Sequence, residues 1–183
     1  MREISLHIMD IAQNSITAGA ALIEISLLIS RKEDRIEVRI GDNGKGMDSE
    51  MVRNVTSPFT TTRTTRRVGL GIPLFMASAQ ASGGSFSITS KVGEGTRIVA
   101  RYVLDNIDRM PIGDFAGTAH TLIVCNPDLD FVITVEIDGK RETLDTREVR
   151  GVLGEGVPLD LPDVSSWLKE NLAEMFPPEY AEL

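Results

Sequence analysis

The strand-like segments of this chain come in adjacent pairs, and this pairing constrains the fold more than any other feature. Residues 21–30 (ALIEISLLIS) are rich in apolar and β-branched residues, and residues 35–40 (RIEVRI) alternate with period two. Only the polar turn RKED separates them, so they predict an antiparallel hairpin. Residues 85–92 and 96–104, joined through Gly-Glu-Gly, predict a second hairpin. Such pairs favour a mixed or antiparallel sheet and do not fit a doubly wound parallel sheet.

Segments with helical spacing lie before and after the first hairpin. Between about residues 3 and 17, one helix face carries Ile4, Ile8, Ile11 and Ser15. Residues 71–83 predict another helix, with a proline in its first turn and a glycine at its end. Asp48 is placed to cap a short helix over about residues 49–54. The order predicts a sheet covered by helices on one face, with a long loop before the second long helix.

Residues 105–183 predict a small α+β extension to a first domain at 1–104. After a connector over 105–119, strands are expected at HTLIVCN (120–126), DFVITVEI (130–137) and RETLDT (141–146). A short helix from about Arg147 and an amphipathic helix at 165–176 follow. This part is small for an independent core. It is expected to add strands to the first sheet or to form a dimer surface, so a homodimer stays open.

Charge and cysteine content bound the class of protein. The net charge of −8 argues against nucleic acid or an anionic membrane as the main partner. The single cysteine, Cys125, cannot form an internal disulfide and lies in an apolar run, so we expect a buried small side chain and a cytoplasmic protein. No segment approaches the roughly 18 apolar residues needed to span a bilayer.

The sequence DNGKGM (residues 42–47) follows directly on the first hairpin. A calcium loop needs oxygen ligands at its third and fifth positions, where Gly44 and Gly46 stand. A P-loop, G-x-x-x-x-G-K-[ST], occurs nowhere in the chain. By itself the segment is a surface turn with glycines at positive φ, or the floor of a nucleotide pocket.

Two further segments carry candidate chemistry. Asp10 and Asn14 share a face of the first helix at i and i+4. The amide oxygen of Asn14 is a hard ligand suited to Mg²⁺, and Asp10 can orient or deprotonate a water; the alternative is a solvated polar stripe. Gly69 and Gly71 precede a helix whose N-terminal amides can hold phosphate.

Taken in order, these motifs resemble the gyrase, chaperone, histidine-kinase and MutL (GHKL) superfamily of ATP-binding domains over about residues 3–104. DIAQNSITAGA resembles the family's N box, which implies that Asn14 binds Mg²⁺. DNGKGM resembles the first glycine box, which implies that Asp42 accepts the adenine amino group. Gly44 and Gly46 of that box would let the backbone approach the base, and Met47, its last residue, is also assigned to the site.

The later motifs extend the resemblance to the phosphates. SPFTTTR resembles the kinase-type segment at the root of an ATP lid, which implies a role for Phe59. VGLGI resembles the second glycine box, which assigns Gly69, Leu70 and Gly71 to the phosphates. GEGT resembles the closing hairpin, which assigns Thr96 to the site. Arg63, Arg66 and Arg67 lie in the lid segment and are candidate phosphate cations. Arg67 stands where the kinase-type box has one more glycine.

The resemblance implies an α/β (α+β) two-layer sandwich of the Bergerat type that binds ATP with Mg²⁺. We expect a stand-alone ATPase or histidine- or serine-kinase-like module acting on a protein partner or phosphoacceptor. The alternative is a non-catalytic nucleotide sensor whose ATP lid regulates a partner. Asp10, the candidate catalytic residue, stands where hydrolytic branches have a glutamate, and its shorter side chain leaves hydrolysis open. Neither His7 nor His120 has the helical context of a phospho-accepting histidine.

Overall fold

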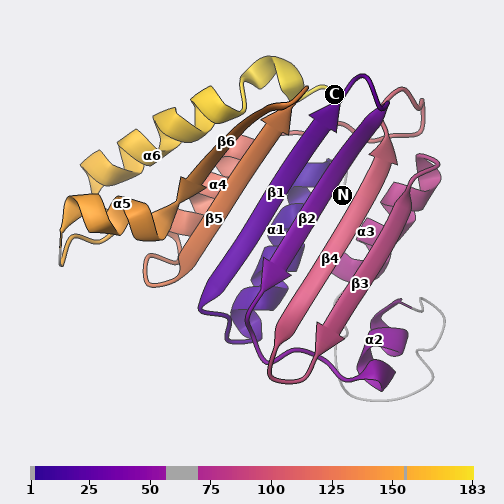
Figure 1. The fold of residues 1–183 in the computed structure, drawn as a ribbon, viewed down its shortest axis with the longest axis horizontal. Helices are drawn as coiled ribbons and strands as arrows, with labels where there is room; N and C mark the ends of the chain where they lie inside the picture. Colours follow the sequence, from indigo (N-terminus) through magenta and orange to yellow (C-terminus); the bar gives the residue numbers. More distant parts are fainter. Residues whose placement is uncertain (1–2, 57–69, 155) are drawn as a thin grey trace.

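The computed structural model describes residues 3–56, 70–154 and 156–183, which form a six-stranded mixed sheet (Figure 1). The strand order is β3-β4-β2-β1-β5-β6. The strands are β1 (Leu22–Ser30), β2 (Arg35–Asp42), β3 (Ser85–Lys91), β4 (Gly95–Val103), β5 (Asp130–Ile137) and β6 (Lys140–Asp145). All neighbouring pairs are antiparallel except β1 and β5, which run parallel. The predicted mixed, mostly antiparallel sheet is therefore confirmed.

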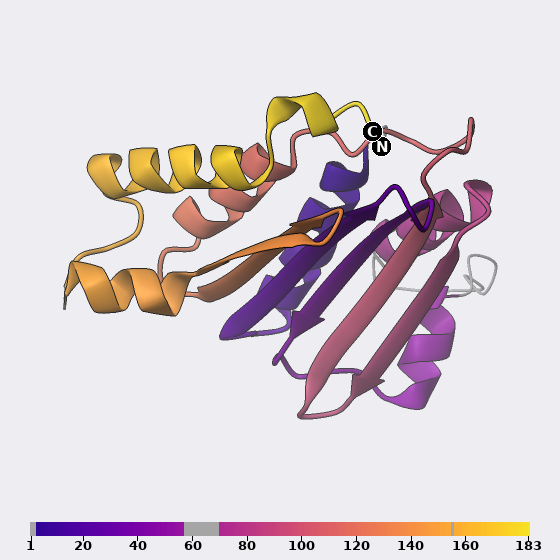
Figure 2. The same ribbon diagram turned by 45° about the horizontal axis from the view of Figure 1, so that its top comes forward.

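Helices cover one face of this sheet, as the views in Figures 1 and 2 show. The helices are α1 (Ile4–Thr17), α2 (Ser49–Thr56), α3 (Gly71–Ala81), α4 (Phe115–Val124), α5 (Thr146–Leu153) and α6 (Pro162–Met175), followed by the 3₁₀ turn η1 (Pro178–Tyr180). Helix α1 lies between α3 and α4 and packs against both. Its buried isoleucines at four- and three-residue spacing face alternate residues of β1 and β2, which explains why each segment adopts its period.

The C-terminal segment continues the first sheet. Strand β5 pairs in parallel with β1, so that Ile25 lies opposite Ile133, and β6 closes the edge. Phe131 and Leu168 belong to the same hydrophobic cluster as Ile8 of α1. Residues 105–183 thus add strands to the first sheet, as expected, and a dimer surface on this part stays a prediction.

The segment HTLIVCN was predicted to be a strand, and this prediction is wrong. It forms the end of α4, which begins where the side chain of Asp114 accepts a hydrogen bond from the amide of Gly117 at 2.8 Å. The buried residues of this helix have helical spacing that a short apolar run does not reveal: Phe115, Thr118, Ala119, Leu122 and Ile123. Cys125 lies just beyond the helix and is exposed, so its predicted burial is also wrong.

No helix in the described ranges has the length and apolar character needed to cross a membrane.

Candidate functional site

A cavity of about 600 Å³ opens where α1, α2 and the start of α3 meet the ends of β2 and β4. It contains several residues that the motifs singled out, far apart in sequence: Asn14, Asp42, Gly46, Met47 and Thr96. Its apolar walls come from residues that were not assigned to the site from the sequence, although Ile11 and Ile72 lie within quoted motifs: Ile11, Ile40, Met51, Val55, Ile72 and Ile98. A mostly apolar cavity with a few polar groups is typical of a small-molecule site.

The carboxylate of Asp42 is held from both sides. The hydroxyl of Ser15 donates to Oδ2 at 2.7 Å, and the amide of Gly44 donates to Oδ1 at 2.9 Å. Ser15 is buried in α1, whereas Asp42 is half-buried at the end of β2. An ionised carboxylate has about four acceptor positions, so both oxygens retain capacity for a ligand N–H. The sequence contained one signal for Ser15, a hydroxyl on the otherwise apolar face of the first helix.

The glycine loop after β2 packs against its neighbours through its glycines. A Cβ at Gly44 would lie 3.1 Å from the carbonyl oxygen of Ala18 at the end of α1. Gly46 has a φ of +65°, and a Cβ there would lie 2.0 Å from the carbonyl oxygen of Lys91 in the β3–β4 hairpin. The loop is thereby fixed between α1 and this hairpin. That these glycines also leave room for a base stays a prediction.

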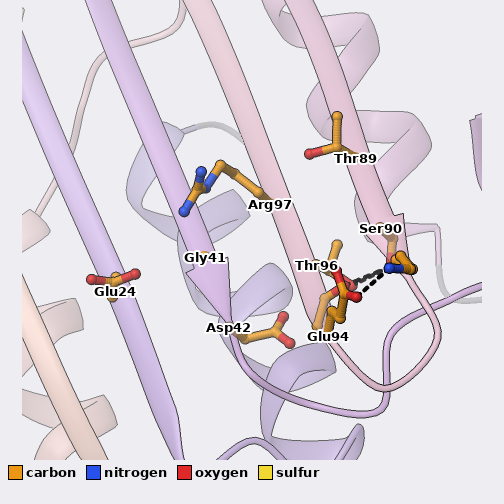
Figure 3. A pocket seen from close by; sticks show the side chains of 10 residues that line it. Glu24, Gly41, Asp42, Thr89, Ser90, Glu94, Thr96 and Arg97 are labelled. Carbon is orange, nitrogen blue, oxygen red and sulfur yellow. Dashed lines mark hydrogen bonds and ion pairs between the residues drawn. The ribbon is translucent and has the colours of Figure 1, made fainter.

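A hydroxyl cluster joins the glycine loop to the hairpin. The amide of Met47 donates to Oγ of Ser90 at 2.8 Å, and Oγ of Ser90 lies 2.9 Å from both the Gly95 carbonyl oxygen and the Thr96 hydroxyl. Figure 3 shows Ser90 on β3 beside Thr96 on β4. Thr96 and Met47 belong to the sequence motifs, whereas Ser90, which links them, was not singled out by any motif.

The polar stripe of α1 meets the first residue of α3. A Cβ placed on Gly71 would lie 3.4 Å from Oδ2 of Asp10 and 3.8 Å from Nδ2 of Asn14. Both side chains are exposed at this junction. Leu70, the residue before the helix, is 70% exposed. The structure thus brings the candidate base and the candidate magnesium ligand to the N-terminus of α3.

The donor set at this junction is incomplete for a protein-only metal site. In the part of the chain that the structure describes, no group of three or more His, Cys, Asp or Glu side chains could hold a metal. One amide oxygen and one carboxylate nevertheless suit Mg²⁺, which commonly takes one or two protein ligands and completes its shell with phosphates and water. The residues present therefore fit Mg²⁺ that arrives with a triphosphate.

His7 packs in the helix layer and makes no hydrogen bond with the described residues through either ring nitrogen. It is 2% exposed and stacks on Phe75 of α3, with ring centroids 5.3 Å apart. Burial lowers its pKa to about 4, so the ring is neutral at pH 7. This environment is that of a packed helix histidine.

Three of the predicted site residues, Phe59, Arg63 and Gly69, lie outside the described residues, as do Arg66 and Arg67 of the lid segment.

A second, shallower hollow of about 310 Å³ lies by the β3–β4 hairpin at the ends of these strands (Figure 3). Glu24 and Arg97 flank Gly41 there, and Asp42 and Thr96 line this hollow as well as the larger cavity. The ends of β2 and β4 are therefore a wall shared by two hollows.

Comparison with known proteins assigns the domain. The family model described as "Histidine kinase-, DNA gyrase B-, and HSP90-like ATPase" matches residues 2–106. Sensor protein DegM of Bacillus sp. is 26% identical over 97 residues, which is 53% of this chain and 26% of that protein. A putative sensor histidine kinase, NtrY-like, of Rickettsia conorii is 26% identical over 108 residues, 59% of this chain and 18% of that protein. The chain thus spans about a quarter or less of these relatives.

A solved structure shares the fold. The crystal structure of the N-terminal domain of a DNA repair protein aligns with a TM-score of 0.54 at 17% identity, covering 85% of this chain and 58% of that chain.

Proposed function

This chain belongs to the family of histidine kinase-, DNA gyrase B- and HSP90-like ATPases, and we propose that its main cavity binds ATP together with Mg²⁺. The observation that carries the proposal is the cavity itself, in which Asn14, Asp42 and Thr96 meet over apolar walls. A planar base suits the apolar walls, and Asp42 supplies a fixed acceptor for an amino group.

The phosphate end lies at the N-terminus of α3 in this proposal. The free amides and positive end of a helix of eleven residues favour negative charge. Asn14 would hold Mg²⁺, and the bound ion would offset the charge of the phosphates. Leu70 and Gly71 stand at this helix start and are assigned to the phosphates, and Gly69, outside the described residues, is expected to join them. Arg63, outside the described residues, contributes a cation.

Asp10 is our candidate for the base that orients or deprotonates the attacking nucleophile. It is exposed next to Gly71 and one helical turn from Asn14, within the region expected for the terminal phosphate. Phosphoryl transfer depends mostly on positioning and charge stabilisation, which this arrangement supplies. We propose an ATPase or protein-kinase-like module that acts on a protein partner or phosphoacceptor.

The alternative is a nucleotide sensor with little or no turnover, in which nucleotide binding changes a partner surface. The specific observation in its favour is the short side chain of Asp10 on an exposed helix face. A base must come within hydrogen-bond reach of its proton, and aspartate reaches less far than glutamate.

Binding is tested first by isothermal titration of the full chain with Mg·ATP and Mg·ADP. Asp42→Asn replaces the acceptor charge with an amide of the same shape and is expected to weaken ATP binding at least tenfold. Asp108→Asn is the matched control, because Asp108 is exposed and outside the cavity. Equal affinities for the two variants would refute the assignment of Asp42.

Turnover separates the enzyme from the sensor. If the wild-type chain releases phosphate, and Asp10→Asn abolishes this release while Mg·ATP binding persists, the chain is an enzyme. If the wild-type chain and Asp10→Asn both bind Mg·ATP without releasing phosphate, even with candidate partners present, the sensor is supported. Magnesium is tested by titrating ATP with and without EDTA. The magnesium-dependent gain in affinity should disappear in Asn14→Ala and remain in the wild-type chain.

A further inference from the structure

The hydroxyl of Ser90 has three hydrogen-bonding contacts but only one proton to donate, which limits which of its neighbours can be donors and which acceptors. Its hydroxyl is one donor and two acceptor positions. The Met47 amide can only donate to it, and the Gly95 carbonyl can only accept from it. With the Ser90 proton on the Gly95 carbonyl, Thr96 is the donor in the 2.9 Å contact between the Thr96 and Ser90 hydroxyls.

The direction of the Thr96 hydrogen bond determines what the cavity offers to a ligand. Because the hydroxyl proton of Thr96 points to Ser90, the Thr96 oxygen can only accept hydrogen bonds from a ligand. Asp42, its register partner on the adjacent strand, is a carboxylate and also accepts only. Both residues line the cavity. The end of the cavity that they form thus presents acceptors side by side, and it matches a ligand edge rich in N–H donors.

We propose that Ser90 is a positioning residue that sets the hydrogen-bond polarity of Thr96 and thereby makes the cavity select 6-amino purines over 6-oxo purines. This inference rests on the proposed nucleotide site. A 6-amino group donates to the acceptor pair. A 6-oxo group brings another acceptor against it and remains unpaired, and an unpaired polar group in a binding site lowers affinity.

The test compares three Mg-bound triphosphates that differ at the C6–N1 edge of the purine. ATP and purine riboside triphosphate differ only at C6, where ATP has an amino group and purine riboside triphosphate a hydrogen. Inosine triphosphate has an oxygen at C6 and also an N–H at N1, where the other two have an acceptor. Titration calorimetry with the wild-type chain should rank them in the order ATP, purine riboside triphosphate, inosine triphosphate. Ser90→Ala releases the Thr96 proton, which can then turn to the 6-oxo group. The ratio of ATP to inosine triphosphate affinity should fall about tenfold, the worth of one hydrogen bond.

A merely structural role for Ser90 predicts something else. If Ser90 only holds Met47 in place, Ser90→Ala weakens all three ligands by the same factor and leaves their ratios unchanged. Ser87→Ala is the matched control, since Ser87 is an exposed serine of the same strand outside both hollows. Ser90→Thr keeps the hydroxyl and should retain the wild-type ratio.

Thr96→Val provides a second route that does not depend on the folding of Ser90→Ala. If the Thr96 hydroxyl accepts a hydrogen bond from the ligand, Thr96→Val weakens ATP binding and leaves inosine triphosphate binding unchanged. If the hydroxyl donates to the ligand, Thr96→Val weakens inosine triphosphate binding and leaves ATP binding unchanged, and the inference is overturned. An affinity ratio that Ser90→Ala leaves unmoved also overturns it, while the nucleotide site stands. Wild-type protein that binds none of the three ligands overturns both this inference and the proposed function.

Discussion

Replacing Gly46 with alanine tests what the glycine loop is for. The residue has a φ of +65°, and an added Cβ would lie 2.0 Å from the carbonyl oxygen and 2.7 Å from the carbonyl carbon of Lys91. Alanine at this position would therefore lower the free energy of unfolding in two ways. It would force an L-residue into a left-handed backbone conformation, and its Cβ would clash with the backbone of the β3–β4 hairpin. The clashing atoms belong to backbone, so a side-chain rotation cannot relieve it.

Gly93 separates the two costs. It has a φ of +80°, yet a Cβ there meets nothing within 4 Å. Gly93→Ala should cost only the left-handed conformation, about 1–2 kcal/mol. Gly46→Ala should cost that amount plus about 1–3 kcal/mol for the shift that makes room for the methyl group. Each kcal/mol lowers the melting temperature of a domain of this size by about 2–4 °C.

The assay is urea unfolding of both variants, followed by Mg·ATP titration of the folded proteins. We expect Gly46→Ala to be the less stable by at least about 1 kcal/mol. Gly46→Ala should also weaken ATP binding, because displacing the loop separates the Met47 amide from Ser90 and the Asp42 carboxylate from Ser15. Gly93→Ala should bind ATP within about twofold of wild type. Equal stabilities for the two variants would refute the packing role of Gly46.

Other substitutions test the buried polar groups. Ser15→Ala should weaken ATP about tenfold with little loss of stability, because it frees one oxygen of Asp42 to turn; calorimetry beside unfolding measures both. Burial alone would raise the pKa of Glu37, but hydrogen bonds from Arg101 and a second arginine outweigh it, so the pKa is lowered. This lowered pKa contributes stability above about pH 4.5 that is lost as pH falls through the folded pKa, and Glu37→Gln should flatten the acid limb of stability against pH. The pKa of His7 is about 4 in the folded protein against 6.5 in the unfolded chain, so the free energy of unfolding declines by up to about 3 kcal/mol as pH falls from about 6.5 to 4. Urea unfolding of His7→Phe should lack this contribution, most clearly between about pH 6.5 and 5, where Glu37 does not contribute.

Local patterns predicted the elements whose period is long and uninterrupted. The alternation in 35–40 is the signature of a strand buried on one face, and the isoleucines of α1 have the spacing of a helix buried on one face. The run HTLIVCN was mispredicted because a short apolar segment is compatible with both structures. Its helix is set by the Asp114 cap and by packing against α1 and α6.

The candidate site divides in the same way. Its motifs identified Asn14, Asp42 and Thr96, since each lies in a short segment of recognisable spacing. Ser15 was placed on the buried face of the first helix, but its partner could not be read from that segment. Ser90 was missed because nothing in its own segment distinguishes it from a surface serine. They acquire their roles from residues 27 and 43 positions away, Asp42 and Met47.

The sequence by itself determined the paired strands, the first helix, the order of the nucleotide motifs and the family. These depend on residues close together in the chain, where backbone preference and the side that is buried leave a periodic record. Only the tertiary structure decided that β5 joins β1 in parallel, that Gly46 makes room for the hairpin at Lys91, and that the hydroxyl of Ser90 lies 2.9 Å from that of Thr96. Those outcomes depend on which distant segments lie within a few ångströms of one another, and packing sets that distance.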